Sequence, residues 1–87
     1  MKIKEGFTIR EMIGDYIIIP LGENALEYAG IITTNEVGKD IWTYLQDEHS
    51  EEELFAYMMS IYEVEEEVLR TDIKNMVAKL EEYHLFV

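Results

Sequence analysis

The sequence predicts an α+β domain with a winged-helix-like arrangement, in which a three-stranded antiparallel N-terminal sheet is followed by three helices. Apolar residues alternate with polar ones or form β-branched runs in the first third of the chain. After residue 34 they recur every three or four positions, as in amphipathic helices. All predicted strands therefore precede all predicted helices, which is typical of helices that cover one face of an antiparallel sheet.

The predicted strands are joined by two short turns. Phe7 and Ile9 alternate with polar residues in the first strand, and the β-branched run of residues 16–19 forms the second. Gly14-Asp15 is a hairpin signal between these two strands. The third strand is expected over Leu26 to Ile32. In such a meander the first and third strands are the edges of the sheet.

Start signals and apolar periodicity define the three predicted helices. Thr34 or Asn35 is placed to cap the first helix. Ser50 and Glu53 form a capping box at the start of the second. The third and longest helix is expected from about residue 65 to residue 83. The inner stripes of the three helices are, in order, Val37, Ile41, Tyr44 and Leu45, then Leu54, Met58 and Ile61, then Leu69, Ile73, Met76 and Leu80.

Length and composition predict one domain over residues 1–87. Hydrophobic residues make up 48% of the chain, enough to bury a core. The absence of cysteine excludes disulfides, thiolate metal sites and cysteine nucleophiles. The longest apolar run in the N-terminal third, from Tyr16 to Leu21, is only as long as a strand, so we expect no membrane span and a cytoplasmic location.

The charge argues against a nucleic-acid partner. Nineteen acidic residues oppose seven basic ones, which gives a net charge of −12. Such a chain repels the phosphate backbone, which proteins bind through lysine and arginine. The winged-helix shape is often a DNA reader, but here the charge argues against that role.

Catalytic chemistry has little support in the sequence. His49 and His84 are the two histidines, and each lies near a predicted helix end, where surface or capping roles are common. The two histidines do not have the helical i, i+4 spacing of a zinc protease (HExxH), and no glycine-rich phosphate loop is present. We therefore expect a protein that is not an enzyme and that holds no metal and no cofactor.

Several short motifs resemble those of the PqqD-like family. Residues 34–42 (Thr-Asn-Glu-Val-Gly-Lys-Asp-Ile-Trp) are similar to the family segment that opens its first helix, and residues 50–54 to the start of its second. Tyr62-Glu63-Val64 resembles the aromatic-acidic-valine turn that follows. The resemblance covers residues 5–87, and its remaining matches are Asp72-Ile73, Met76-Val77 and Leu80 in the third helix, with His84-Leu85-Phe86 where Gly-Leu-Leu is usual.

The resemblance implies a recognition element for ribosomally synthesised and post-translationally modified peptides (a RiPP recognition element). Such a protein is a non-catalytic peptide chaperone in natural product biosynthesis. It binds the leader segment of a precursor peptide by strand addition to its third strand, in a groove walled by the third helix, and presents it to a separate modifying enzyme. The best-known member serves pyrroloquinoline quinone synthesis alongside a radical enzyme, so a radical SAM enzyme is one candidate partner.

The expected third strand has the features of an edge that accepts another chain. It contains neither lysine nor proline, which commonly block such edges, and Glu27 is its one charge. Gly30 would allow another backbone to approach closely. The strand contributes these residues to the expected peptide-binding set: Leu26, Glu27, Tyr28, Ala29, Gly30, Ile31 and Ile32.

The third helix contributes the second part of the expected set. Arg70 and Lys74 lie one helical turn apart and would meet acidic leader side chains. Ile73 and Val77 lie beside them and would receive apolar leader side chains.

Two alternatives stay open for these features. The edge strand can be an ordinary one, covered by the protein's own third helix. Arg70 and Lys74 can pair on the surface with Glu66, Glu67 or Asp72. A winged-helix regulatory or dimerisation module without a role in peptide maturation would keep the same fold, because pairing of two third strands in a homodimer buries the same edge.

Overall fold

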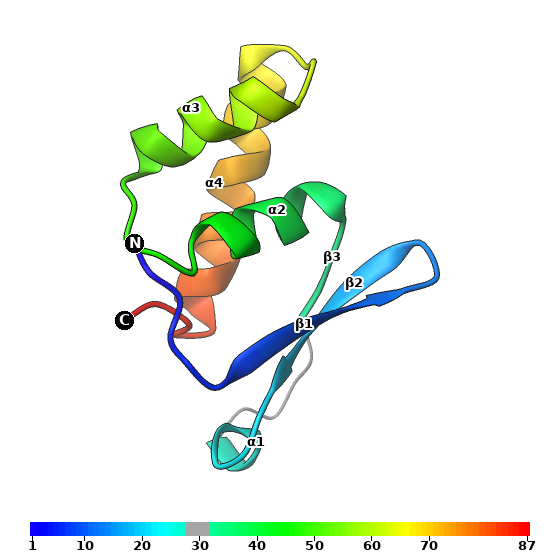
Figure 1. The fold of residues 1–87 in the computed structure, drawn as a ribbon, viewed down its shortest axis with the longest axis vertical. Coiled ribbons are helices and arrows are strands. Elements are labelled where there is room, and N and C mark those ends of the chain that lie inside the picture. The colour runs from blue at the N-terminus through cyan, green and yellow to red at the C-terminus, as the bar shows by residue number, and fades with distance from the viewer. Residues whose placement is uncertain (28–31) are drawn as a thin grey trace.

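The computed structural model describes residues 1–27 and 32–87. Helices α2, α3 and α4 pack together, and the hairpin of β1 and β2 extends away from them (Figure 1). The predicted α+β class, with an antiparallel sheet ahead of three main helices, is confirmed. The elements are β1 (Phe7–Met12), β2 (Asp15–Pro20), the single turn α1 (Asn24–Glu27), β3 (Ile32–Thr34), α2 (Glu36–Tyr44), α3 (Glu51–Ile61) and α4 (Glu66–Glu82).

The sheet has the order β1-β2-β3, and both neighbouring pairs are antiparallel. Met12 pairs with Asp15, so Ile13 and Gly14 alone form the turn of the hairpin. Gly14 has φ of 82°, a left-handed conformation that glycine adopts without steric cost. The predicted hairpin is therefore confirmed, and the glycine is the residue that the turn requires.

The two faces of the sheet have different roles. Ile9, Ile18 and Ile32 align across the three strands, and Ile18 and Ile32 are buried in the core with the helices. Alternation of side chains along a strand places Arg10, Ile17 and Thr33, which also align, on the opposite face.

The predicted third strand over Leu26 to Ile32 is wrong at its start. Leu26 and Glu27 belong to the helical turn α1, and the strand begins at Ile32 and continues through Thr33 and Thr34. The cause is hydrogen bonding by Asn24 to a distant part of the chain, because its side-chain amide donates to the carbonyl oxygens of Glu5 and Gly6. These two bonds hold the helical turn α1 against the residues that precede β1. The apolar pattern predicts extended chain for Leu26 and Glu27, which lie in this turn. Residues 28–31 of the predicted strand lie outside the described residues.

The predicted helix starts are confirmed by their hydrogen bonds. The side chain of Asn35 accepts from the Gly38 amide at 2.9 Å and caps α2. Ser50 and Glu53 accept from each other's backbone amides at 3.1 and 2.8 Å, which is the predicted capping box. Leu54 and Met58 are buried as predicted, but Ile61 is 47% exposed because it is the last residue of α3 and turns away from the core.

Helix α4 ends in a Schellman motif built on a histidine. The amide of Leu85 donates to the carbonyl oxygen of Leu80, and the amide of His84 donates to that of Glu81. His84 has φ of 56°, the left-handed position that glycine commonly occupies. Leu80 and Leu85 are both buried, so the apolar contact that accompanies this motif is present. Phe86 forms a bridge with Ile3, which fixes the C-terminal segment on the domain as the apolar tail suggests.

Within residues 1–27 and 32–87, no helix combines the length and the apolar character that crossing a bilayer requires.

Candidate functional site

The outer edge of β3 is the first component of the candidate site. Among residues 1–27 and 32–87, β3 is the last strand in the sheet order and has a partner strand on one side only. A two-residue hairpin closes on a hydrogen-bonded pair, here Met12 with Asp15, and hydrogen-bonded pairs alternate along antiparallel strands. The backbone groups of Ile17 therefore face β1, and those of its neighbours on β2 face β3. It follows that Thr33, opposite Ile17, directs its backbone N–H and C=O away from β2.

One flank of α4 is the second component. The Thr34 hydroxyl, at the end of β3, lies 3.8 Å from the Met76 sulfur of α4. A hollow of about 200 Å³ opens at this contact, which we call the β3–α4 hollow. Its lining residues are Thr34, Asn35, Val37, Gly38, Asp72, Asn75, Met76 and Lys79.

A glycine on α2 sets how closely β3 approaches the helices. Gly38 is buried, and a Cβ atom built on it would lie 1.8 Å from the Thr34 hydroxyl oxygen and 2.9 Å from the Thr34 Cβ. The backbone of α2 thus touches the last residue of β3. The β3–α4 hollow owes its shape to this contact.

The charged groups of the β3–α4 hollow lie at its two ends along α4. Asp72 and Lys79 are seven residues apart, about 10 Å along a helix at 1.5 Å per residue. Within the described part of the chain, no ion pair engages either residue. A ligand lying along the hollow therefore meets a carboxylate near one end and an ammonium near the other.

A hydrogen bond outside the lining of the hollow joins α2 to the end of α3. The Tyr62 hydroxyl donates to the Asp40 carboxylate. Partial burial acts to raise the pKa of Asp40, but hydrogen bonds from Lys39 and Tyr62 outweigh it and hold that pKa below its ordinary value. Burial and the bond to Asp40 raise the pKa of the Tyr62 phenol. The pair therefore stays a phenol and a carboxylate near neutral pH and ties α2 to the end of α3.

The helix residues predicted to bind a peptide lie on the other flank of α4. Arg70, Ile73 and Lys74 line a separate hollow of about 500 Å³ between α3 and α4. The Arg70 guanidinium lies 3.8 Å from the centroid of the Phe55 ring of α3 and pairs with Glu66 and Glu52 at 3.1 and 3.4 Å. Surface pairing, the alternative interpretation, is thus what the structure shows for Arg70. For Lys74 no ion pair occurs among the described residues.

Ile73 and Val77, which are predicted to receive apolar leader side chains, are largely buried in this structure. They are only 2% and 8% exposed, because they face the core with Leu69 and Leu80. From the strand part of the predicted set, Ile32 is also a core residue and Leu26 projects from α1. Tyr28, Ala29, Gly30 and Ile31 lie outside the described residues, and so does the side chain of Glu27.

The sequence interpretation missed Thr33, Thr34, and the α4 flank of Asp72, Asn75, Met76 and Lys79. The four helix residues have the spacing i, i+3, i+4, i+7, which places them on one flank. The spacing alone could therefore have indicated that these four residues lie on one side of the third helix. The sequence does not show which flank of the helix faces the sheet, because that depends on how α4 crosses α2.

No group of three or more histidine, cysteine, aspartate or glutamate side chains that would hold a metal ion occurs within residues 1–27 and 32–87.

Comparison with known proteins identifies the family. A family model described as coenzyme PQQ synthesis protein D (PqqD) matches residues 24–85. A solved structure described as "TbiB1 in Complex with the TbiA(beta) Leader Peptide" superposes with a TM-score of 0.70. The match covers 98% of this chain and 93% of that chain at 19% sequence identity, which supports a shared fold. No curated protein sequence matches. Because the match to the family model covers more than two thirds of the residues of this chain, the chain belongs to the PqqD family.

Proposed function

We propose that this protein is a peptide chaperone that binds the leader segment of a ribosomally synthesised precursor peptide. The observation that carries the proposal is the unpaired edge of β3, with the backbone of Thr33 directed outward next to the β3–α4 hollow. Membership of the PqqD family supports it. The similar solved structure supports it as well, because its description records a complex with a leader peptide.

The mode of binding we propose is strand addition. An extended peptide would hydrogen-bond to the Thr33 backbone, and its alternate side chains would point toward α4. The β3–α4 hollow, about 200 Å³, has room for one large side chain against Met76. Asp72 and Lys79 would select a basic and an acidic peptide side chain at its two ends. Residues 28–31 of the predicted peptide-binding set lie outside the described residues.

We further propose that the bound peptide is presented to a separate modifying enzyme, for which a radical SAM enzyme is one candidate. A peptide that binds by its backbone at an edge strand keeps the residues outside the bound segment accessible. Binding and chemistry can then be divided between two proteins, with the chaperone acting in trans.

The proposed binding at the outer edge of β3 is tested by removing the backbone N–H of Thr33, which points away from β2. In Thr33→Pro the outward N–H is lost, and because that amide does not pair with β2, an edge strand tolerates the change. Loss of one backbone hydrogen bond and the steric effect of the ring predict a fall in peptide affinity of about tenfold or more. The matched control Thr33→Val keeps the amide and the branched shape. The measurement is fluorescence anisotropy with a labelled leader peptide from the precursor gene adjacent to the gene for this chain.

Normal peptide affinity of a folded Thr33→Pro variant would show that strand addition at β3 is incorrect. An NMR titration distinguishes leader-peptide binding at β3 and α4 from the alternative function, a regulatory module that binds another protein. Leader binding should shift the amide signals of Ile32 to Thr34 and of Asp72 to Lys79. Shifts confined to residues 55–62 would instead favour a protein-binding regulatory module, and a concentration-dependent dimer in gel filtration would favour pairing of two β3 edges.

A further inference from the structure

The tip of the β1–β2 hairpin carries an exposed apolar surface. Ile13, in the turn, is fully exposed, and Met12 beside it is 53% exposed. A hollow of about 250 Å³ adjoins them. We call its lining residues the hairpin patch: Met12, Ile13, Asp15, Ile17 and Thr33.

The turn itself does not require these apolar side chains. Two-residue hairpin turns favour glycine, asparagine and aspartate, and here Gly14 supplies the left-handed residue. A fully exposed isoleucine adds no buried area to the fold. Ile13 and Met12 therefore have no explanation within the packing of the described chain.

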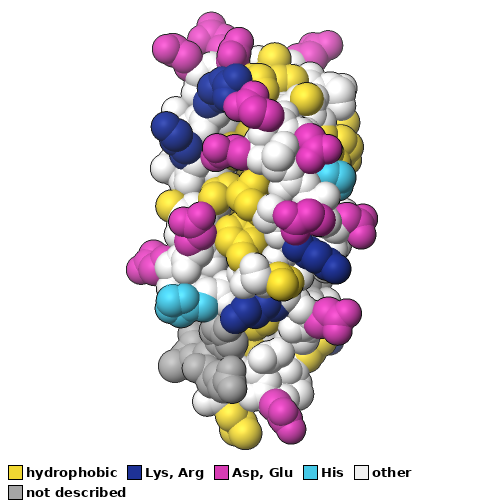
Figure 2. Space-filling model, turned by 90° about the vertical axis from the view of Figure 1, so that its left-hand side faces the viewer, with side chains coloured by type: hydrophobic (Ala, Val, Ile, Leu, Met, Phe, Trp, Pro, Cys, Tyr) yellow, Lys and Arg dark blue, Asp and Glu magenta, His cyan; other side chains and the backbone are white. Residues whose placement is uncertain are grey.

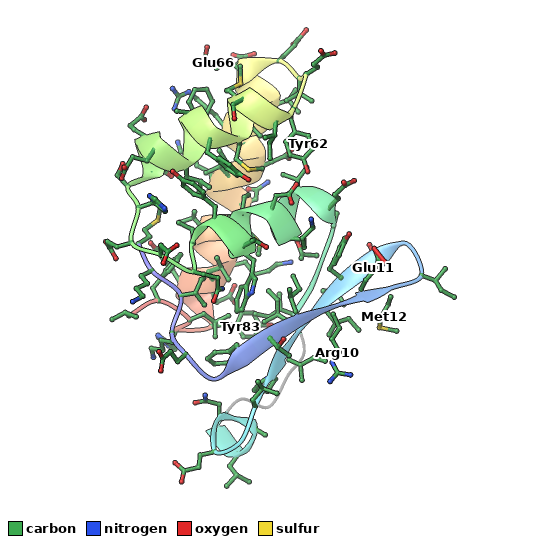
Figure 3. The ribbon with its side chains drawn as sticks, in the orientation of Figure 1. Arg10, Glu11, Met12, Tyr62, Glu66 and Tyr83 are labelled. Carbon is green, nitrogen blue, oxygen red and sulfur yellow. The ribbon has the colours of Figure 1, made fainter. Side chains whose placement is uncertain are left out.

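The hairpin patch lies on the face of the sheet opposite the core. Arg10 and Met12 project from β1 away from the helices, whereas Glu11 between them projects to the other side (Figure 3). Ile17 and Thr33 pair across β2 and β3 on this same outer face. Thr33 also provides the outward backbone groups of the proposed edge. A protein that covers the hairpin patch would thus contact β3 at the position where the peptide binds.

The charge near the patch indicates what kind of surface can cover it. Asp15 lines the hairpin patch, Arg10 projects from β1 on the same face as Met12, and Glu11 projects to the other side. The whole chain carries a net charge of −12, so acidic groups dominate the surface as a whole. Figure 2 shows the side of the molecule that faces away from the hairpin tip, and there too acidic side chains are scattered between apolar ones while basic side chains occur as separated spots. Like charge opposes both a second copy of this chain and an anionic lipid surface. A protein with an apolar pit bordered by lysine or arginine is complementary to the tip.

We infer that the hairpin patch is the docking surface for the peptide-modifying enzyme, which receives Met12 and Ile13 in an apolar pit with a basic rim. The inference rests on the proposed function for the existence of that enzyme. It adds a second interface, adjacent to the peptide edge but made of different side chains.

The test is a calorimetric titration of the modifying enzyme encoded adjacent to this chain, in the absence and in the presence of the precursor peptide. The double variant Met12→Ser/Ile13→Ser removes the apolar tip and keeps Gly14 and the turn. Its enzyme affinity should fall by about tenfold or more, the value of burying one large aliphatic side chain. Its peptide affinity should equal that of the wild type. The control Val87→Ser changes an 85% exposed apolar residue at the C-terminus, far from the hairpin, and should leave both affinities unchanged.

The possible results lead to different conclusions. Equal enzyme affinity of the wild type and the double variant would overturn the docking surface. Loss of a wild-type dimer in the double variant, measured by sedimentation, would assign the patch to a second copy. Loss of wild-type binding to phosphatidylcholine–phosphatidylglycerol vesicles would assign it to a membrane. If the wild type binds the enzyme through Met12 and Ile13 but does not bind the precursor peptide, the proposed function fails and the docking surface stands.

Discussion

Substitution of Gly38 by alanine tests the contact that positions the candidate site. In an exposed helix position this change stabilises a protein by about 0.8 to 1.0 kcal/mol, because alanine is the better helix former. Here the new methyl group would lie 1.8 Å from the Thr34 hydroxyl oxygen, 2.9 Å from its Cβ and 3.0 Å from its Cγ2. Rotation of the threonine side chain moves the oxygen but leaves Cβ in place, since Cβ is fixed to the backbone. The end of β3 must therefore move away from α2.

The two effects have opposite signs, and their sizes decide the outcome. Overpacking of a tight contact costs about 1 to 3 kcal/mol, which exceeds the gain in helix propensity. Because the contact involves Cβ and not only the rotatable oxygen, we expect the overpacking cost to prevail and Gly38→Ala to lower the free energy of unfolding by up to about 2 kcal/mol. In a domain of this size each kcal/mol corresponds to a fall in melting temperature of about 4 to 8 °C.

Urea unfolding followed by circular dichroism measures the change, and a double-mutant cycle assigns it to Thr34. Thr34→Ala removes the hydroxyl oxygen and Cγ2, so Gly38→Ala should cost less in that background, with a coupling energy of about 1 kcal/mol or more. Leader-peptide affinity should fall in Gly38→Ala and recover in part in the double variant. A Gly38→Ala protein as stable as the wild type or more stable would refute the argument that α2 and β3 touch here.

Two further predictions concern the ends of the helices. Replacing His84 by glycine should raise the free energy of unfolding by about 1 kcal/mol, because a side chain at positive φ is strained and glycine is not; a less stable His84→Gly protein in urea unfolding would contradict this. Tyr62→Phe should destabilise the protein at pH 7 by about 1.5 to 3 kcal/mol, as expected for a hydrogen bond to a charged group. Since the pKa of Asp40 is lowered in the folded state, the stability from this contact is present above about pH 4, the ordinary range of an aspartate, and is lost as the pH falls through the lower folded value. The difference in free energy of unfolding between Tyr62→Phe and the wild type should therefore be smaller at pH 3 than at pH 7. An equal difference at both pH values would show that the Tyr62 hydroxyl does not stabilise the protein through the Asp40 carboxylate.

The local signals in the sequence predicted the elements well where hydrogen bonds and side chains are close in the chain. Ser50 and Glu53 are three residues apart, and the capping box that they form is the predicted one. The apolar stripe of Leu69, Ile73, Met76 and Leu80 is buried as its spacing requires. The failure at Leu26 has a cause of longer range, because Asn24 bonds to backbone carbonyls eighteen and nineteen residues away. The alternation of apolar and polar residues from which a strand is predicted carries no information about a hydrogen bond between residues so far apart in the chain.

The sequence by itself determined the fold class, the family and the helix boundaries, because these follow from periodicity, capping residues and ordered motifs along one chain. Tertiary structure alone decided which flank of α4 faces β3. Arg70 and Lys74 share one flank and Asp72 and Lys79 the other, and either assignment satisfies the spacing in sequence. The packing of Gly38 against Thr34 and of Arg70 against Phe55 fixes the choice. Contacts between residues distant in the chain set helix orientation, so the flank of α4 that borders β3 follows only from the tertiary structure.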